Sequence, residues 1–215
     1  MKNAYFLIIK IVKKFSVSKN LYVFYKSELA KYKLKSVIKQ KKVKIELGSG
    51  SKKGANGWVT IDLYGADINL DLRKNLPLPG ESVDEFFASH FLEHLNFTEL
   101  LKFLTGVHKQ LKFNGKFIGA VPDAAFFVMK YMNQEDIRES VPIIHKKSYN
   151  DTNSSIDILN YIAYMGEEHK FMFDRENLCN IFRSIGFREF VYRRFDDDLD
   201  TKEHQDYTIY FEAIK

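Results

Sequence analysis

The chain has 215 residues, 45% hydrophobic and 15% aromatic, which is enough to bury the core of one domain with appendages. Its single cysteine, Cys179, excludes an intramolecular disulfide framework and fits a reducing cytoplasm. The net charge of +5 hides an asymmetry: residues 1–44 contain 13 lysines and one acid, giving +12, and the remainder carries −7. We therefore divide the chain into a basic arm, residues 1–42, and an acidic body, residues 43–215.

The arm begins with an unbroken apolar run of only six residues, Ala4–Ile9, whereas a bilayer span needs about 20. It also lacks the small-residue cleavage pattern of a signal peptide. A helix here would place Ile8 and Ile11 on one face and lysines on the opposite face. Such a helix could pack on the body, or residues 1–40 could lie on an anionic membrane surface. Nucleic acid is a weaker alternative, because the arm contains no recognised nucleic-acid module.

The body opens with a glycine turn between two strands. An apolar strand, Val43–Leu47, leads into Gly48-Ser49-Gly50, and the next strand ends on Asp62. Glycine lets the backbone approach a ligand, and a carboxylate at the end of the next strand can accept both hydrogen bonds of a ribose diol. The pattern indicates a nucleotide-like cofactor, with an ordinary tight turn as the alternative.

The spacing of this motif narrows the kind of cofactor. A dinucleotide fingerprint has a third glycine opening a helix and an acid about 20 residues on. Here Asp62 follows Gly50 by 12 residues, and the segment between the strands is too short and too glycine-rich for a crossover helix. A nicotinamide dehydrogenase is therefore disfavoured. A cofactor with a ribose and no phosphate, such as S-adenosylmethionine, fits better.

Two further strings identify a resemblance. Residues 76–84 read Leu-Pro-Leu-Pro-Gly-Glu-Ser-Val-Asp, and residues 89–95 read Ser-His-Phe-Leu-Glu-His-Leu. With the glycine turn, they resemble class I S-adenosylmethionine-dependent methyltransferases of the methyltransferase type 11 kind, closest to small bacterial members. The likeness runs from about Val43 to Phe187. It implies that residues 43–215 form a methyltransferase domain that uses S-adenosylmethionine.

The resemblance also implies roles by position. Ribose contact falls to Asp62 with Leu63 beside it, adenine contact falls to Asp71 and Leu72, and the other expected cofactor residues are Glu46, Gly48, Ser49, Gly50, Ser89 and His90. The sequence departs from the common pattern at residues 52–57, where Lys-Lys-Gly-Ala-Asn-Gly replaces the usual helix. This departure leaves the contacts to the methionine end of the cofactor open.

Strands and helices alternate through the body, which predicts an α/β fold. We expect a Rossmann-like, seven-stranded, mostly parallel sheet with helices on both faces and an antiparallel last strand. The polar segment 133–155 is expected to be a mobile excursion, and residues 133–170 an insertion that covers the substrate. The expected strands are 43–47, 58–62, 67–71, 84–89, 116–121, 187–194 and 207–214, and the expected helices are 96–111, 156–165 and 174–186.

Three residues are candidates for contact with the methyl acceptor. A hydroxyl acceptor needs a base, and histidine has a suitable pKa. His90 ends the fourth strand, Asp123 follows the fifth, and His169 lies in a segment that resembles the family's active-site mouth. We expect no metal site: His90 and His94 are four residues apart, but the metalloprotease order His-Glu-x-x-His is absent.

The sequence thus predicts a cytoplasmic S-adenosylmethionine-dependent methyltransferase, and it leaves open whether the arm packs on the body or contacts the inner membrane face. The acceptor is expected to be a small molecule or a lipid-linked molecule. A surface-polysaccharide sugar is preferred, because related bacterial sequences are often encoded beside such enzymes. A membrane-associated protein that keeps the fold without catalysis is the alternative from another class, and a cleft blocked by Lys52 and Lys53 would favour it.

Overall fold

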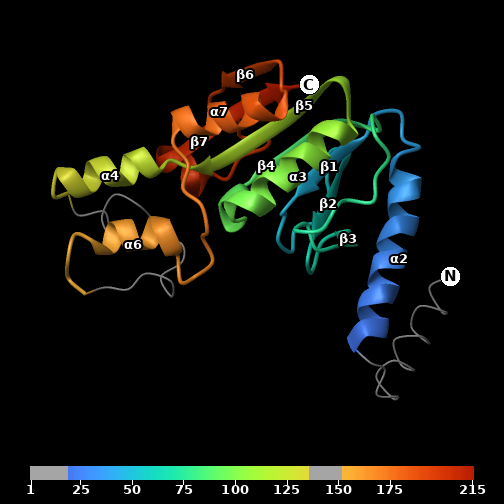
Figure 1. Ribbon diagram of the computed structural model, residues 1–215, viewed down its shortest axis with the longest axis horizontal. Coiled ribbons are helices and arrows are strands. Elements are labelled where there is room, and N and C mark those ends of the chain that lie inside the picture. The colour runs from blue at the N-terminus through green and yellow to red at the C-terminus, as the bar shows by residue number, and fades with distance from the viewer. Residues whose placement is uncertain (1–18, 136–151) are drawn as a thin grey trace.

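The computed structural model describes residues 19–135 and 152–215, with side chains from Tyr25 onward, and is built on a seven-stranded sheet (Figure 1). The strands follow the order β3-β2-β1-β4-β5-β7-β6. Their bounds are β1 Lys44–Leu47, β2 Trp58–Asp62, β3 Ile68–Asn69, β4 Val83–Ser89, β5 Leu111–Pro122, β6 Glu189–Tyr192 and β7 Thr208–Ile214.

The strand directions confirm the expected sheet. Strands β1 to β5 pair in parallel, and β7 runs antiparallel to both β5 and β6. The carboxyl ends of the parallel strands therefore share one edge, where ligands bind in open α/β sheets. Two strands are much shorter than expected: β3 has two residues instead of five, and β6 has four instead of eight.

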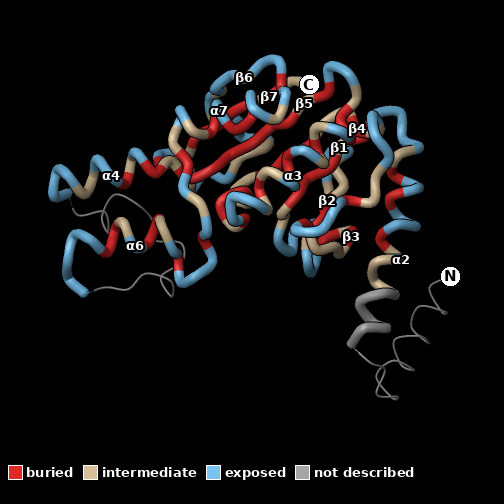
Figure 2. Tube along the Cα trace, in the orientation of Figure 1, coloured by how far each residue is buried: buried red, intermediate tan, exposed pale blue. Residues whose placement is uncertain are grey.

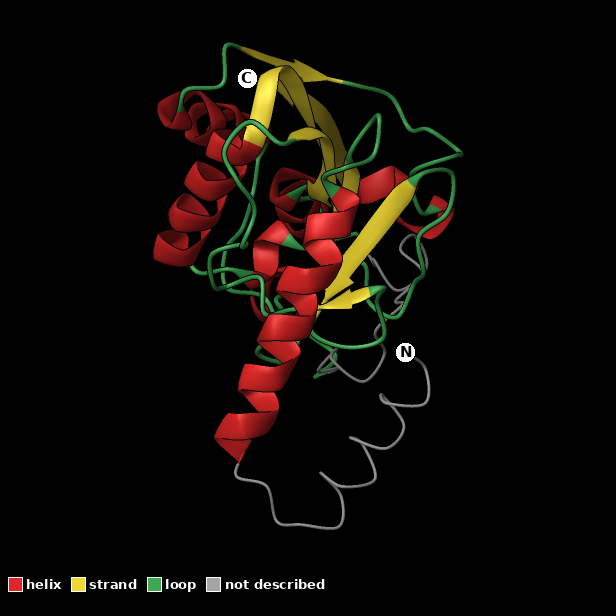
Figure 3. Ribbon diagram, turned by 90° about the vertical axis from the view of Figure 1, so that its right-hand side faces the viewer, coloured by secondary structure: helices red, strands yellow, loops and turns green. Residues whose placement is uncertain are grey.

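The helices are α2 Lys19–Val37, α3 Phe97–Gln110, α4 Ala124–Met132, α6 Asp157–Tyr164 and α7 Arg175–Ile185, and the 3-10 turns are η1 Leu92–His94 and η3 Lys202–Tyr207. Figure 1 shows α3 and α7 side by side over the sheet. Figure 3, seen from the α2 side, shows the first turns of α2 projecting beyond the sheet. Within the described residues, no helix is both long and apolar enough to cross a membrane.

The main core lies between the sheet and the helices α3 and α7. Ile45, Phe86 and Phe117 are lateral neighbours on three strands, and all three are fully buried (Figure 2). From α7, Phe182 packs on Phe117 with ring centroids 5.3 Å apart. Full burial of each such side chain stabilises the fold by about 1.5–3 kcal/mol before the entropy of ordering is counted.

Helix α2 belongs to the same core. Ala30, Leu34 and Val37 recur at spacings of four and three and are buried, although lysines surround them in the sequence. This stripe fixes the second half of α2 beside β3, where Lys33 Nζ also donates to the carbonyl of Asp67 at 2.5 Å. The amphipathic segment expected at Ala4–Phe15 lies outside the described residues.

The opposite face of the sheet is covered at its β7 end by the segment that enters η3. Tyr210 points away from the main core, and Arg193 lies over its ring at 5.1 Å. The guanidinium of Arg193 also makes a bidentate pair with Asp200, at 2.5 and 2.6 Å, and the Asp200 side chain is fully buried. Burial and two parallel hydrogen bonds make this pair costly to break.

The helices α4 and α6 form a second, smaller core beyond the carboxyl end of the sheet (Figures 1 and 2). Phe127 of α4 is fully buried against Tyr161 of α6 and Tyr207 of η3. Helix α6 confirms the expected helix at 156–165, whereas α4 was not anticipated. Most of the segment predicted to be mobile, residues 136–151, lies outside the described residues, so mobility and substrate covering there stay predictions.

Candidate active site

A cavity of about 560 Å³ opens at the carboxyl ends of the parallel strands. This volume is within the usual range for small-molecule sites. Seven of the ten expected cofactor residues border it: Gly48, Gly50, Asp62, Leu63, Asp71, Leu72 and His90. They come from four loops that are distant in sequence, and the parallel sheet brings them together.

The turn after β1 gives the cavity a backbone wall. Gly48 has φ +72°, and a Cβ atom on it would come within 2.4 Å of the Phe91 ring. Its N–H donates to the carbonyl of Ile61 at 2.9 Å, which ties the turn to β2. Gly50 has φ +62°, and a Cβ there would meet nothing within 4 Å. One glycine is therefore required by packing, and the next leaves open space beside the backbone.

Asp62 ends β2 and reaches back to this turn. Its Oδ2 accepts a hydrogen bond from the N–H of Gly50 at 2.8 Å, and its Oδ1 accepts one from the N–H of Leu63 at 2.5 Å. An ionised carboxylate has about four acceptor positions, so two remain for a diol. The contact also fixes the glycine turn relative to β2.

Asp71 lies on the cavity wall and is already engaged by Arg73, a residue that the sequence did not single out. The guanidinium makes two hydrogen bonds to the carboxylate, both at 2.9 Å. These bonds hold the pKa of Asp71 below its usual value despite partial burial. Asp71 is consequently an ionised acceptor with Arg73 beside it on the same wall.

The other three expected cofactor residues, Glu46, Ser49 and Ser89, do not border the cavity as described. Glu46 is buried and pairs with Lys52 at 3.1 Å. The hydroxyl of Ser49 is buried without a hydrogen-bond partner among the described residues. Ser89 completes β4 in register with Ala120, one residue before His90.

His90 borders the cavity in a strained backbone conformation, with φ +49°. Such conformations cost about 1–3 kcal/mol and cluster at functional sites. Its Nε2 lies 3.0 Å from the hydroxyl of Thr208, and its ring centroid lies 4.1 Å from that of His204, with the two rings tilted by 49°. The strain directs this imidazole from the end of β4 to the cavity wall.

Glu93, on the turn η1, is an unusual buried acid. It is 2% exposed, and in the part of the chain that the structure describes neither carboxylate oxygen has a hydrogen-bond partner. Burial raises its pKa to about 8. Nδ1 of His90 lies 3.5 Å from its Oε1. An acid in this environment usually has a functional explanation.

His169 lies close to the turn η1. Its ring is buried and stands 5.2 Å from the ring of His94. The ligand atoms of Glu93, His94 and His169 all lie within 4.8 Å of one another. His169 is the predicted substrate contact, and its proximity to Glu93 could not be predicted from the sequence because the two are 76 positions apart.

Asp123 makes a structural contact at the start of α4. Its side chain accepts from the N–H of Ala125 at 3.0 Å and caps α4, and burial raises its pKa. It does not border the cavity. Its role as a catalytic residue stays a prediction.

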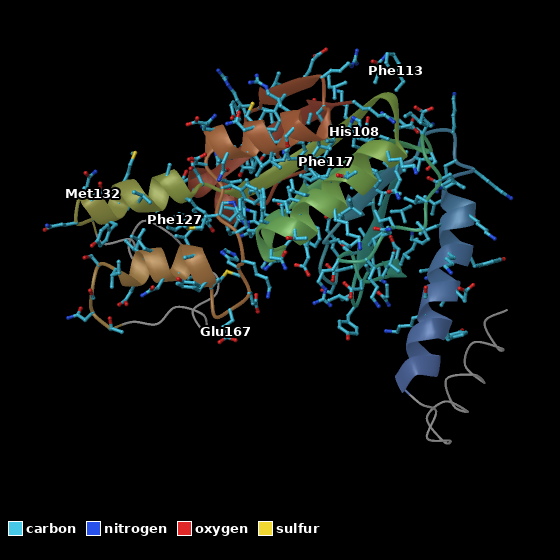
Figure 4. All side chains as sticks on the ribbon, viewed as in Figure 1. His108, Phe113, Phe117, Phe127, Met132 and Glu167 are labelled. Atoms are coloured by element: carbon cyan, nitrogen blue, oxygen red, sulfur yellow. The ribbon has the colours of Figure 1, made fainter. Side chains whose placement is uncertain are left out.

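The outer wall of the cavity was not predicted from the sequence. It comes from the loop after α6. Glu167, Glu168 and Lys170 border the cavity, and Figure 4 shows Glu167 on this loop. The N–H groups of Lys170 and Phe171 donate to the carbonyl of Glu93 at 2.8 and 3.2 Å, which docks the loop on η1. Gly166 was the one local signal of a turn here.

No protein-family model and no curated protein matches the sequence. Among solved structures, an S-adenosylmethionine-dependent methyltransferase from Archaeoglobus fulgidus aligns over 98% of this chain and 99% of its own, with a TM-score of 0.50 and 16% identity. This chain has the class I methyltransferase fold.

Two other methyltransferase structures align at lower scores. One from Thermotoga maritima covers 86% of this chain and 87% of its own, with a TM-score of 0.49 and 15% identity. One from Mesorhizobium loti covers 80% and 90%, with a TM-score of 0.46 and 16% identity. The expected fold is thus confirmed by the strand order and by the alignment with the Archaeoglobus fulgidus structure.

Proposed function

We propose that the protein is an S-adenosylmethionine-dependent methyltransferase. The observation that supports this most directly is the joint position of Gly48, Gly50 and Asp62 on one cavity wall at the carboxyl edge of a methyltransferase-type sheet. A fold alone does not establish an activity. The proposal therefore depends on the two glycines, beside which a cofactor can approach the backbone, and on the acid, which can bind the hydroxyl groups of a ribose.

The residues present fit this cofactor. The open side of Gly50 admits a ligand against the backbone, and the orphaned hydroxyl of Ser49 is available to bond to one. We assign the ribose hydroxyls to Asp62 and the adenine to Asp71 and Leu72. Glu46 is held back by Lys52, so its contact with the methionine end requires that pair to open.

S-adenosylmethionine would supply a methyl group on a positively charged sulfur. The protein then has to bind, align and dehydrate the reactants, and such positioning can contribute about 7–11 kcal/mol. We propose that His90 accepts the proton of a hydroxyl acceptor, because its imidazole borders the cavity. Thr208, at 3.0 Å from Nε2, would orient the ring.

We further propose a small-molecule or lipid-linked acceptor, with a sugar of surface polysaccharide as the preferred class. The support is the polar outer wall: Glu167, Glu168 and Lys170 offer donors and acceptors to a hydroxyl-rich molecule. The same proposal places the protein in the cytoplasm, with residues 1–40 near an anionic membrane.

A non-catalytic protein of the same fold remains the alternative, and one observation disfavours it. Lys52 and Lys53 do not obstruct the described cavity, because Lys52 pairs with Glu46 and Lys53 donates to the carbonyl of Ala66 at 2.6 Å. The two lysines that were expected to block the cleft therefore do not border it.

The proposal is tested by calorimetric titration with S-adenosylmethionine, S-adenosylhomocysteine and NAD. We expect binding of both adenosyl compounds and none of NAD. Asp62→Ala should weaken adenosyl binding by about 100-fold, because it removes two hydrogen bonds to a charged acceptor. The exposed acid Asp197 supplies a matched control, Asp197→Ala, which should bind as the parent does.

Failure of all three ligands to bind the folded parent would overturn the proposal and favour the non-catalytic alternative. Equal binding by Asp62→Ala and the parent would contradict the assignment of Asp62 specifically.

A further inference from the structure

We propose that Glu93, His94 and His169 form a binding site for a divalent transition-metal ion beneath the cavity wall. Their ligand atoms lie within 4.8 Å of one another. Two imidazoles and one carboxylate are a ligand set that Zn²⁺ and Fe²⁺ accept in proteins, with positions left open for water or substrate. The proposal is independent of the methyltransferase activity.

The buried carboxylate is the first argument. Glu93 is 2% exposed, and neither of its oxygens has a hydrogen-bond partner among the described residues. The nitrogen Nδ1 of His90 approaches Oε1 only to 3.5 Å, which is longer than a normal hydrogen bond. Buried polar groups are almost always satisfied, and an ion held between this carboxylate and the imidazoles of His94 and His169 would satisfy it. On either side of Glu93 in this segment, Leu92 and Leu95 are also buried.

The hydrogen bonds of the histidines are the second argument. Nδ1 of His94 lies 3.1 Å from the carbonyl oxygen of Glu168, and Nδ1 of His169 lies 2.7 Å from that of Ile162. A carbonyl can only accept, so each Nδ1 carries the proton and each Nε2 carries the lone pair. Metal-binding histidines are oriented in this way by backbone carbonyls.

The backbone of the loop is the third argument. The consecutive residues Met165, Gly166 and Glu167 have φ values of +38°, +64° and +75°. All three therefore adopt the left-handed region, although two of them are not glycine. This costly turn comes directly before the segment that delivers His169 to η1. The loop is then fixed by its two hydrogen bonds to the carbonyl of Glu93.

The separations show what binding would require. Ligands of a tetrahedral zinc ion lie about 3.4 Å apart, at metal distances near 2.1 Å. The widest pair in the cluster must therefore close by roughly 1.4 Å or less, which side-chain rotation can supply. Because His94 also borders the cavity, an open position on the ion would be reached from the cavity.

The test uses the full chain, stripped of metal by chelation and titrated with ZnCl₂ and CoCl₂ in the absence of S-adenosylmethionine. We expect one equivalent of zinc to bind, and the cobalt form to show visible absorption typical of four or five ligands. His94→Gln and His169→Gln should each weaken binding by about 100-fold or more, since even outer-shell changes cost 10–100-fold.

The matched control is His108→Gln. His108 packs on Phe187 at 4.9 Å, and Figure 4 places it on α3 away from the Glu167 loop. This variant should bind zinc as the parent does. Circular dichroism of each metal-free variant separates loss of a ligand from loss of fold, and His94→Gln, at a partly exposed position, is the variant least expected to disturb the fold.

A parent protein that binds no zinc, or a folded His94→Gln variant that binds it as tightly as His108→Gln, would overturn the proposal. Retained zinc binding by the parent without any binding of S-adenosylmethionine would leave the metal site standing and contradict only the proposed function.

Discussion

The site depends on single residues whose backbone geometry is unusual. Gly48 and His90 both have positive φ values, and each lies where a strand ends at the cavity. Glycine adopts this conformation without strain, whereas histidine does so only when its surroundings compensate. The two positions therefore respond differently to substitution.

Gly48→Ala should remove cofactor binding and lower the free energy of unfolding by about 2–4 kcal/mol. The new Cβ would be strained at φ +72° and would meet the Phe91 ring at 2.4 Å. Thermal unfolding and titration with S-adenosylhomocysteine measure both effects. Gly106→Ala is the control: its Cβ would meet nothing within 4 Å in α3, and we expect about 0.5–1 kcal/mol of added stability.

His90→Gln should leave adenosyl-ligand binding within about twofold of the parent and lower turnover by about 100-fold or more, because it removes only the proposed base. Release of S-adenosylhomocysteine in the presence of a sugar or lipid-linked sugar measures turnover. Unchanged turnover by the variant would exclude His90 as the base.

At the scale of elements, helix ends are where the sequence was most informative. The helix predicted to start at Asp174 and end before Gly186 is α7, with both capping contacts present and Gly186 at φ +111°. Asn96 and Glu99 form the same reciprocal cap on α3. Local signals sufficed here, because caps are satisfied within four residues.

Other elements depend on distant contacts and were predicted less well. Strand β5 begins at Leu111 and not at the expected residue 116, because Leu111 already pairs with Val83 of β4. Helix α4 is set by burial of Phe127 against residues from α6 and η3. The same limit applies to the site: Asp62 and the glycines follow local spacing, whereas Arg73 and Lys170 reach the cavity only through the fold.

Asp174→Ala should lower the free energy of unfolding by about 1 kcal/mol, because it removes the acceptor for the N–H of Asn177 at 2.7 Å. Urea unfolding measures the change. Asp197→Ala, on the exposed surface, should change stability by less than about 0.5 kcal/mol. A loss of equal size in both variants would contradict the capping role.

The molecule as a whole should lose stability in acid. Guanidinium hydrogen bonds lower the pKa of Asp71. For Asp67 and Asp84, burial alone would raise the pKa, but hydrogen bonds outweigh it and the pKa of both is lowered. Asp67 accepts these bonds from Thr60 and Gly54, and Asp84 accepts them from Lys112 and Val43. A carboxyl whose pKa is lower in the folded than in the unfolded protein stabilises the fold at pH values above its unfolded pKa, near 3.9 for Asp. This contribution is lost as the pH falls through the folded pKa.

Unfolding by urea at pH 7, 4 and 3 should show this decline, and Asp84→Asn should flatten it. Asp84 receives two hydrogen bonds from Lys112, at 2.8 and 2.9 Å, that the amide would weaken. An unchanged slope in Asp84→Asn would exclude this residue as a source of the decline.

The proposed membrane contact also belongs to this scale. Deletion of residues 1–18 should reduce co-sedimentation with anionic vesicles and leave neutral vesicles unaffected, because each lysine near such a surface contributes about 1 kcal/mol. A longer deletion would be a poor test, since Leu34 and Val37 are buried in the main core. Equal pelleting of the parent and the deletion would contradict the proposal.

The position of β7 has a consequence for biosynthesis. It lies between β5 and β6 in the sheet, although it follows both in the chain. While the polypeptide emerges from the ribosome, β6 has no neighbour in the sheet and β5 keeps an open edge until β7 has been made. Unpaired edges with aromatic residues such as Phe190 and Phe117 promote aggregation. The nascent protein should therefore depend on chaperones, or on slow synthesis at low concentration, until its last sheet partner arrives.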